Sequence, residues 1–307
     1  MTSEEFEFLL FDRMEKIKQI NAEYDLENNA YISFSGGKDS TILHYLIDLA
    51  LPNNKIPRLF INTGIEYNDI VNYVKALASK DDRIIIYNSG VNIKQMLEKV
   101  GYPFKSKDFA QKVSRFNRLG KTKSIKRFLE FDGILACPDK LKYLFENKNA
   151  TKFIISDKCC ENLKENVLIE TAKKINRNIA IIGLTGDEYG RRNQYHKNCW
   201  IDYRIKKMFY PMRILNNDFI NMFIDKYNIK LCKLYYPPFN LIQTGCKGCP
   251  FTLHLQKQLD MMRELLPNEY KQCETIWKPV YDEYRRIGYR LKKDDGQLTI
   301  FDFIESE

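Results

Sequence analysis

A short glycine-rich stretch, Ser35-Gly36-Gly37-Lys38-Asp39-Ser40, carries the clearest chemical signal in the sequence. It follows an apolar run that favours a strand and precedes a pattern that favours a helix, so the glycines fall at the turn between them. Adjacent glycines allow positive φ and a close approach of the backbone to a ligand, and the first N–H groups of a helix attract anions. The hydroxyls and Lys38 add donors and a positive charge. This stretch is therefore predicted to bind phosphate.

Two closely spaced pairs among the eight cysteines are the second chemical signal. Cys159 and Cys160 are adjacent, and Cys246 and Cys249 form a Cys-x-x-Cys that contains Gly248. Such a turn presents two thiolates to one metal centre, and a second pair completes a four-thiolate site. Four sulfurs suit either zinc or an iron-sulfur cluster, and the residues alone do not choose between them.

Apolar, β-prone runs alternate with helical patterns and would position these residues. The apolar runs cover residues 30–34, 57–62, 83–87 and 179–183, and helical patterns lie near 68–80 and 91–100. Strands that alternate with helices predict an α/β fold, a parallel twisted sheet with helices on both faces. Ligands of such sheets bind at the carboxyl ends of the strands, which is where residues 35–40 and 62–66 fall.

The length and the proline distribution predict a large domain followed by a smaller lobe. A chain of 307 residues can hold both, and Pro237-Pro238 marks a change in composition. Two helical patterns follow, at residues 252–266 and 269–287. We therefore expect a nucleotide-binding domain over 1–234, a mostly helical C-terminal lobe over 235–293 and a flexible tail over 294–307.

The composition bounds the location and the partners. A formal net charge of +9 favours polyanions such as nucleotides or nucleic acid. No apolar run approaches the roughly 20 residues that span a membrane, and the first residues lack the basic start of a signal peptide. We expect a cytoplasmic protein without a membrane partner, in which the cysteines serve as thiols, metal ligands or catalytic groups.

The residues SGGKDS resemble the pyrophosphate loop of the PP-loop (adenine nucleotide alpha hydrolase) superfamily, and in particular its PAPS (phosphoadenosine phosphosulfate) reductase-like family. The Walker loop differs, because its glycines lie further apart. The resemblance implies an adenosine nucleotide bound through Ser35, Gly36, Gly37, Lys38, Asp39 and Ser40. The segment Asn62-Thr63-Gly64 is similar to the family element after the second strand, which implies that Thr63 and Gly64 lie near the nucleotide.

A further family element contains a glycine, a Glu-Ser pair and an arginine that meets the substrate phosphate or sulfate. Gly183, Glu188 and Arg192 match it, whereas Tyr189 replaces the serine and leaves the substrate open. The resemblance implies catalytic roles for Lys38, Asp39 and Arg192. If the substrate is ATP, Asp39 becomes a candidate Mg²⁺ ligand.

The cysteine arrangement resembles that of adenylyl sulfate reductases and bacterial PAPS reductase-like enzymes, which hold a four-iron cluster with an adjacent pair and a distant Cys-x-x-Cys. The resemblance implies a 4Fe-4S cluster, with zinc as the alternative, at Cys159, Cys160, Cys246 and Cys249. Sulfonucleotide reductases also use a nucleophilic cysteine in a C-terminal Glu-Cys-Gly tail. This sequence has no such tail, which weakens a plain reductase assignment.

Residues 105–127 form the most basic tract, with nine lysines and arginines against one acid, Asp108. The tract is either a solvated helical face or a clamp for a large anionic substrate such as nucleic acid. Four phenylalanines in and beside it would either stack on bases or face the core: Phe104, Phe109, Phe116 and Phe128.

The tail segment Gln297–Phe301 resembles the peptide by which bacterial DNA-processing proteins dock on the replication sliding clamp. A mobile terminus suits peptide docking. The alternative is an amphipathic tail that folds back on its own domain.

These features give three functional hypotheses. The first is a PAPS reductase-like enzyme that binds adenosine phosphosulfate or ATP and performs sulfur reduction or transfer with an iron-sulfur cluster, served by an electron or sulfur donor protein. The second resembles the ATP-pyrophosphatase of DNA phosphorothioation, or another nucleic-acid thiolation enzyme. The third is a non-catalytic nucleotide or nucleic-acid binding module with structural zinc.

Overall fold

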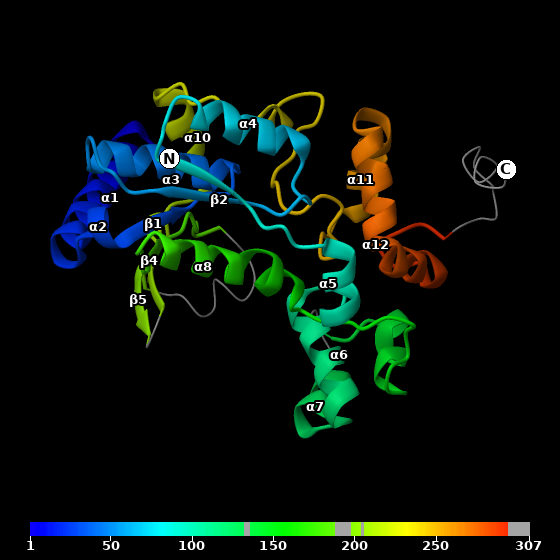
Figure 1. Cartoon of the computed structure of the whole chain (residues 1–307). Helices are drawn as coiled ribbons and strands as arrows, with labels where there is room; N and C mark the ends of the chain where they lie inside the picture. The colour runs from blue at the N-terminus through cyan, green and yellow to red at the C-terminus, as the bar shows by residue number, and fades with distance from the viewer. Residues whose placement is uncertain (132–135, 188–197, 204–205, 294–307) are drawn as a thin grey trace. The chain divides into compact units, whose positions relative to one another are not determined.

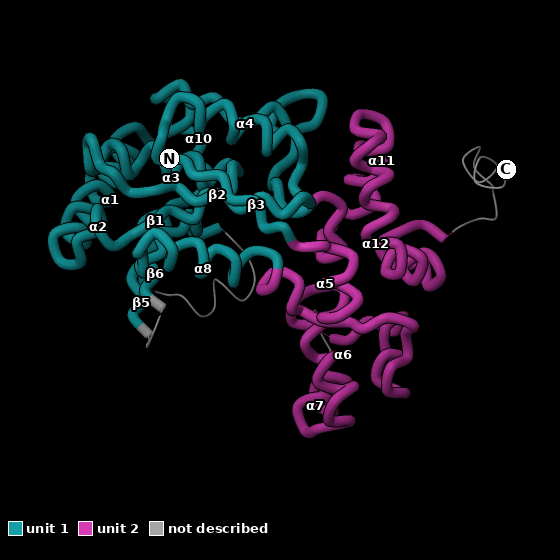
Figure 2. Tube along the Cα trace, viewed as in Figure 1, with its two compact units in different colours: residues 1–90, 163–246 teal, residues 91–162, 247–307 magenta. Residues whose placement is uncertain are grey.

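The structure is a computed structural model, and it describes residues 1–131, 136–187, 198–203 and 206–293. These residues divide into two compact units (Figure 2). The first comprises residues 1–90 and 163–246, and the second comprises 91–162 together with the chain from 247 onward. The sequence-based boundaries at 234 and 293 divide the chain differently and stay predictions. No described helix has the length and apolar character needed to cross a membrane.

A six-stranded sheet with the order β3-β2-β1-β4-β6-β5 forms the centre of the first unit. All neighbouring strands are parallel except β5, which pairs antiparallel with β6 at one edge. The predicted parallel α/β sheet is therefore confirmed, with one antiparallel edge strand added. The strands are β1 (Ala30–Ser33), β2 (Arg58–Asn62), β3 (Ile84–Asn88), β4 (Ile179–Ile181), β5 (Trp200–Tyr203) and β6 (Lys206–Phe209).

Helices cover both faces of this sheet, with α3 and α10 on one face and α8 on the other (Figure 1). Alternate residues of β1 explain why: Tyr31 packs with Ala172 of α8, whereas Ile32 points to the opposite face and is fully buried. The helices of this unit are α1 (Ser3–Tyr24), α2 (Leu26–Asn29), α3 (Lys38–Ala50), α4 (Asn68–Ala78), α8 (Asn166–Lys174), α10 (Asn217–Lys226) and the short η3 (Lys233–Tyr235).

The second unit is built mainly from helices around an aromatic core. Its elements are α5 (Ile93–Val100), α6 (Lys107–Leu119), α7 (Lys123–Glu130), η1 (Asp139–Phe145), α11 (Leu255–Leu265) and α12 (Pro267–Ile287). The single-turn π-helix η2 (Glu161–Glu165) spans the boundary between the units. Phe104, Phe109 and Phe145 are almost fully buried, and Phe109 meets Phe145 edge to face at 5.6 Å between ring centroids.

Candidate functional site: the phosphate loop and the cysteine turn

The loop after β1 has the geometry that the glycines predicted. Gly36 has a φ of +69°, and a Cβ added there would lie 2.5 Å from Val74 Cγ2, so both the conformation and the space require glycine. Gly37 is the N-cap of α3, whose first residue is Lys38. Because β1 lies between β2 and β4, this loop sits where the strand order reverses, at the carboxyl edge of the parallel strands.

Hydroxyl groups hold the loop in shape. Ser40 Oγ donates to the Gly37 carbonyl at 3.0 Å and accepts the Ser35 N–H at 3.2 Å. Thr41 Oγ1 donates to the same carbonyl at 3.0 Å, and Ser35 Oγ accepts the Gly37 N–H at 3.3 Å. The predicted ligand-binding hydroxyls of Ser35 and Ser40 are thus also structural parts of the loop.

Two N–H groups in the first turn of α3 are available to an anion. The N–H groups of Asp39 and Ser40 donate to no acceptor in the described ranges. They lie at the positive end of a 13-residue helix, where the aligned peptide dipoles favour negative charge. The loop therefore has the donors that a phosphate group needs.

Lys38 and Asp39 have contrasting environments. Lys38 Nζ donates to Asn217 Oδ1 at 3.2 Å, and Asn217 is itself held by Asp187 through its N–H at 2.7 Å and its side-chain amide at 2.9 Å. The Asp39 carboxylate has no hydrogen bond or ion pair within the described part of the chain. Burial raises its pKa, an effect that the charge of Lys38 partly opposes. Asp39 is consequently a carboxylate without a structural partner beside an anion site.

Tyr235 is a member of this site that sequence reasoning missed. Its hydroxyl oxygen accepts the Lys38 N–H at 2.8 Å and shares a 2.8 Å hydrogen bond with Thr244 Oγ1. A Cβ on Gly37 would lie 3.1 Å from Thr244 Oγ1 and 3.2 Å from Tyr235 Oη. The only hint in the sequence is a tyrosine next to the composition change at Pro237-Pro238, which does not reveal such a contact.

Gly183 lies against the same helix terminus. A Cβ placed on it would approach the Asp39 carbonyl oxygen to 2.9 Å and the Ser40 nitrogen to 3.3 Å. Glycine is therefore needed for the close packing of the β4 end against the first turn of α3. Glu188, Tyr189 and Arg192, which the resemblance assigned to the same element, lie outside the described residues, as does Gln297–Phe301.

Thr63 and Gly64 form a turn after β2 that Glu66 closes. Glu66 accepts the Thr63 N–H at 2.8 Å and its hydroxyl at 2.9 Å, and it pairs with Lys164 Nζ at 2.9 Å. Burial alone would raise the pKa of Glu66, but Lys164 and Thr63 outweigh burial and hold that pKa below its ordinary value. Gly64 has a φ of +84°, and its N–H donates to Asn62 Oδ1 at 3.2 Å. A nucleotide contact at Thr63 and Gly64 stays a prediction.

The Cys-x-x-Cys turn is anchored by the aromatic side of α12. Trp277 Nε1 donates to the Lys247 carbonyl at 3.0 Å, Tyr281 Oη donates to the Gly248 carbonyl, and Tyr284 Oη donates to the Pro250 carbonyl at 3.1 Å. Gly248 has a φ of +60° and packs against Tyr281 and Cys273. These contacts fix the backbone that carries Cys249, although their donors lie some 30 residues downstream.

The adjacent cysteines have a spacing that suits one metal centre. Cys159 Sγ lies 3.9 Å from Cys160 Sγ, and two thiolates on a tetrahedral zinc with bonds of about 2.3 Å would be about 3.8 Å apart. None of the eight cysteines, all of which are described, is in a disulfide. Within the second unit, no three cysteine sulfurs lie within 4.8 Å of one another in the described ranges. The donor types and the pair fit a metal-thiolate group, and the full four-cysteine site stays a prediction.

Cys137 does not have the environment of a nucleophilic cysteine. It is 4% exposed, and burial raises the pKa of its thiol to about 11. The thiol is therefore mostly protonated near neutral pH, whereas a nucleophilic cysteine reacts as the thiolate.

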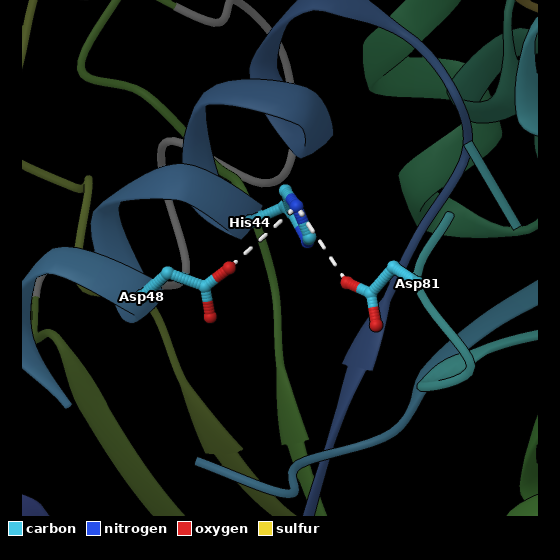
Figure 3. A group of neighbouring side chains, drawn as sticks. All are labelled: His44, Asp48 and Asp81. Carbon is cyan, nitrogen blue, oxygen red and sulfur yellow. Dashed lines mark ion pairs between the residues drawn. The ribbon is translucent and has the colours of Figure 1, made fainter. Parts of the chain in front are cut away.

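A His-Asp-Asp group, His44, Asp48 and Asp81, has side chains close enough to surround a cation (Figure 3). Arginines already neutralise both carboxylates: Asp48 Oδ1 lies 2.6 Å from Arg58 Nη2, and Asp81 Oδ2 lies 2.7 Å from Arg83 Nη2. His44 Nδ1 accepts a 3.1 Å hydrogen bond from Arg58 Nε. Two guanidinium groups at this distance repel a metal ion, so the group is a structural ion-pair network.

Comparison with known proteins places these features in a family. The phosphoadenosine phosphosulfate reductase domain family matches residues 29–288. An uncharacterized protein of Methanocaldococcus jannaschii is 33% identical over 132 residues, a match that covers 40% of this chain and 32% of that relative. The chain thus matches about a third of the length of this curated relative.

Solved structures show weaker likeness. A PAPS reductase of Candida auris, solved as a phosphate complex, is 12% identical with a TM-score of 0.42, over 76% of this chain and 91% of that one. The U34-tRNA thiolase of Methanococcus maripaludis, solved with its [4Fe-4S] cluster, is 14% identical with a TM-score of 0.38, over 94% of this chain and 83% of that one. At these values the likeness does not identify an activity.

Proposed function

Because the chain belongs to the phosphoadenosine phosphosulfate reductase domain family, we propose that it is an enzyme that binds an adenosine nucleotide by its phosphates at Ser35–Ser40. The observation that carries the proposal is the first turn of α3, where the Asp39 and Ser40 N–H groups and the Asp39 carboxylate have no hydrogen-bond partner among the described residues. A glycine turn with only a structural role would need neither available N–H groups nor an adjacent carboxylate. Lys38, Asp39 and, by resemblance, Arg192 would carry the catalytic roles.

The first candidate reaction is reduction or transfer of sulfur from an adenosine phosphosulfate. In the reduction, the bond between the sulfate sulfur and the bridging oxygen breaks, the nucleotide phosphate leaves, and two electrons from a dithiol donor protein convert sulfate to sulfite. Lys38 and the helix terminus would stabilise the charge that develops on the leaving phosphate.

The cofactor of this reaction would be a four-iron cluster at the cysteines and not a cation at His44, because the carboxylates beside His44 already pair with arginines. Cys159, Cys160, Cys246 and Cys249 would hold it, with zinc as the alternative. The cluster would supply positive charge or electrons beside the reacting sulfur. The α12 contacts to the Cys-x-x-Cys turn support this assignment, because they fix a backbone that otherwise has no evident role.

A second candidate is an ATP-pyrophosphatase that activates an acceptor for thiolation, as in nucleic-acid thiolation. Asp39 favours it, because its carboxylate has no hydrogen bond or ion pair with a described residue, and a carboxylate beside bound phosphates suits a Mg²⁺ ion that accompanies ATP. The acceptor oxygen would attack the α-phosphate, form an adenylate and release pyrophosphate. A donor protein would then deliver sulfide-level sulfur to the activated carbon or phosphorus, and AMP would leave with the acceptor oxygen.

Anaerobic assays of the full chain test both candidates. The protein is offered adenosine phosphosulfate with a dithiol donor, or ATP with Mg²⁺, and sulfite and pyrophosphate are measured beside nucleotide affinity. Asp39→Asn should lower product formation at least 100-fold, while Asp82→Asn, a matched change of an exposed carboxylate, should leave it unchanged. Sulfite identifies the first reaction and pyrophosphate the second. Zinc content with no nucleotide binding would overturn both and favour a structural module.

A further inference from the structure

A dense group of unpaired cations lies on α6, α7 and the turn between them. We call the six exposed residues Arg115, Arg118, Lys121, Lys123, Lys126 and Arg127 the α6–α7 basic face. None of the six forms an ion pair or a side-chain hydrogen bond with a described residue. The single acid of the tract, Asp108, pairs with Lys112 instead. No described acidic side chain therefore pairs with this face.

The helices fix the spacing of these cations. Arg115 and Arg118 are about 4.5 Å apart along the axis of α6, and Lys123 and Arg127 are about 6 Å apart along α7. Gly120, with a φ of +73°, ends α6, so α7 follows after a short turn. The side chain of Lys148 also approaches this turn, because its Cε would lie 3.9 Å from a Cβ on Gly120. The cations are thus spaced at regular helical intervals along two consecutive helices.

The aromatic residues of the tract turn inward. Phe104, Phe109 and Phe116 are at most 3% exposed, and Phe128 packs edge to face on Phe145 at 5.7 Å. No aromatic platform for unstacked bases is presented by these four side chains. These four side chains therefore offer no stacking surface, and the cations of the face would hold a partner through its phosphates, which is how the backbone of a double helix is bound.

We propose that the α6–α7 basic face binds the phosphate backbone of a double-stranded nucleic acid. This inference rests on the second unit alone and does not depend on the nucleotide chemistry proposed above. DNA and RNA duplexes share the required phosphate chemistry. An anionic membrane is the competing partner, because Leu119 and Phe131 are about half exposed at the ends of the two helices. The exposed positions between those ends are mostly Lys and Arg, which favours the duplex.

Binding of the full-length protein to a labelled duplex across a salt series tests this proposal. Six phosphate contacts predict a slope of log K against log salt of about −5. The triple variant Arg118→Gln/Lys123→Gln/Arg127→Gln should weaken binding at least tenfold and reduce the slope by about 2.7, since each contact contributes about 0.9. The same measurement with a DNA duplex and with an RNA duplex then shows which nucleic acid the face binds more tightly.

A charge-matched control separates the effect of the α6–α7 basic face on binding from the effect of the net charge. Lys94→Gln/Lys99→Gln/Lys257→Gln removes three exposed cations from the same unit and should leave affinity and slope unchanged. Circular dichroism checks that both variants fold. Equal losses in the two variants would overturn the proposal, as would tighter binding to a single strand than to a duplex. Variant-sensitive binding to phosphatidylserine vesicles without duplex binding would assign the face to a membrane instead. If Asp39→Asn loses nucleotide binding but keeps duplex binding, the nucleotide site and the basic face act independently, and the duplex proposal stands.

Discussion

The hydroxyl oxygen of Tyr235 accepts the N–H of Lys38 at 2.8 Å, although 197 positions separate the two residues. This N–H is the first of α3, and the first N–H groups of a helix are the donors that an anion would otherwise engage. Burial raises the pKa of Tyr235, so its phenol stays protonated and can donate to Thr244. The segment that contains Tyr235 and Thr244, near the end of the first unit, therefore stabilises the phosphate loop.

We expect Tyr235→Phe to destabilise the protein and to strengthen its response to nucleotide. The Lys38 N–H loses its acceptor, at a cost of about 1–2 kcal/mol. Differential scanning fluorimetry should show a Tm lower by roughly 1.5–3 °C. A bound phosphate can accept the freed N–H, so ATP or adenosine phosphosulfate should raise the Tm of the variant more than that of the wild type.

Tyr236→Phe is the control for this prediction. Tyr236 is 44% exposed, and its hydroxyl accepts the Leu231 N–H at 3.2 Å near solvent. The change should shift the Tm by less than about 1 °C, because water replaces an exposed acceptor. An unchanged Tm in Tyr235→Phe together with a smaller nucleotide response would mean that Tyr235 binds the ligand directly.

Glu66→Gln should lower the free energy of unfolding by about 1–2 kcal/mol at pH 7, because a buried carboxylate that pairs with Lys164 and Thr63 loses its charge. The pKa of Glu66 is held below its ordinary value of 4.5, so this stability is present above that pH and is lost as the pH falls through the folded-state pKa. Urea unfolding from pH 7 to 3 should show the two proteins converge. Glu15→Gln, in the exposed pair with Lys18, should change stability by less than about 0.5 kcal/mol at any pH.

His44→Gln should flatten the acid side of the stability profile. Burial, and then the charge of Arg58, lower the pKa of His44 to about 4 from 6.5, so the native state holds the imidazole neutral. That contribution is complete above pH 6.5 and is lost as the pH falls to about 4, an interval worth roughly 3 kcal/mol at about 1.4 kcal/mol per pH unit. Urea unfolding at several pH values measures the difference between the two proteins. A constant difference from pH 7 to 4 would contradict the neutral imidazole.

Local patterns predicted much of the fold. The apolar runs 30–34, 57–62 and 83–87 became β1, β2 and β3 with ends shifted by one residue, because strands of a largely parallel sheet read as continuous apolar runs. The turn between β1 and α3 was also predictable, since paired glycines before a helical pattern have few other uses.

Contacts between distant segments were not predictable. The Tyr235 hydroxyl accepts the Lys38 N–H, and Trp277 donates to the Lys247 carbonyl. Both contacts join a side chain to a distant backbone group, and no hydrophobic periodicity in the sequence indicates such a contact. The strands β5 and β6 were not predicted from the sequence, and β6 begins Lys206-Lys207, which weakens the apolar pattern of a strand. The assembly of 91–162 with the chain after 247 likewise depends on tertiary packing.

Gly248→Ala should disrupt the Cys-x-x-Cys turn and lower the content of the metal group proposed at the cysteines. An added Cβ would lie 2.5 Å from Tyr281 Oη and 2.8 Å from Cys273 Sγ, at a φ of +60° that alanine adopts poorly, so we expect a loss of roughly 2–4 kcal/mol. Iron, sulfide and zinc per chain, measured after anaerobic purification, should fall at least threefold. Gly245→Ala is the matched control, because its Cβ would meet no atom within 4 Å. Wild-type metal content in Gly248→Ala would show that the metal, if bound, does not depend on this turn.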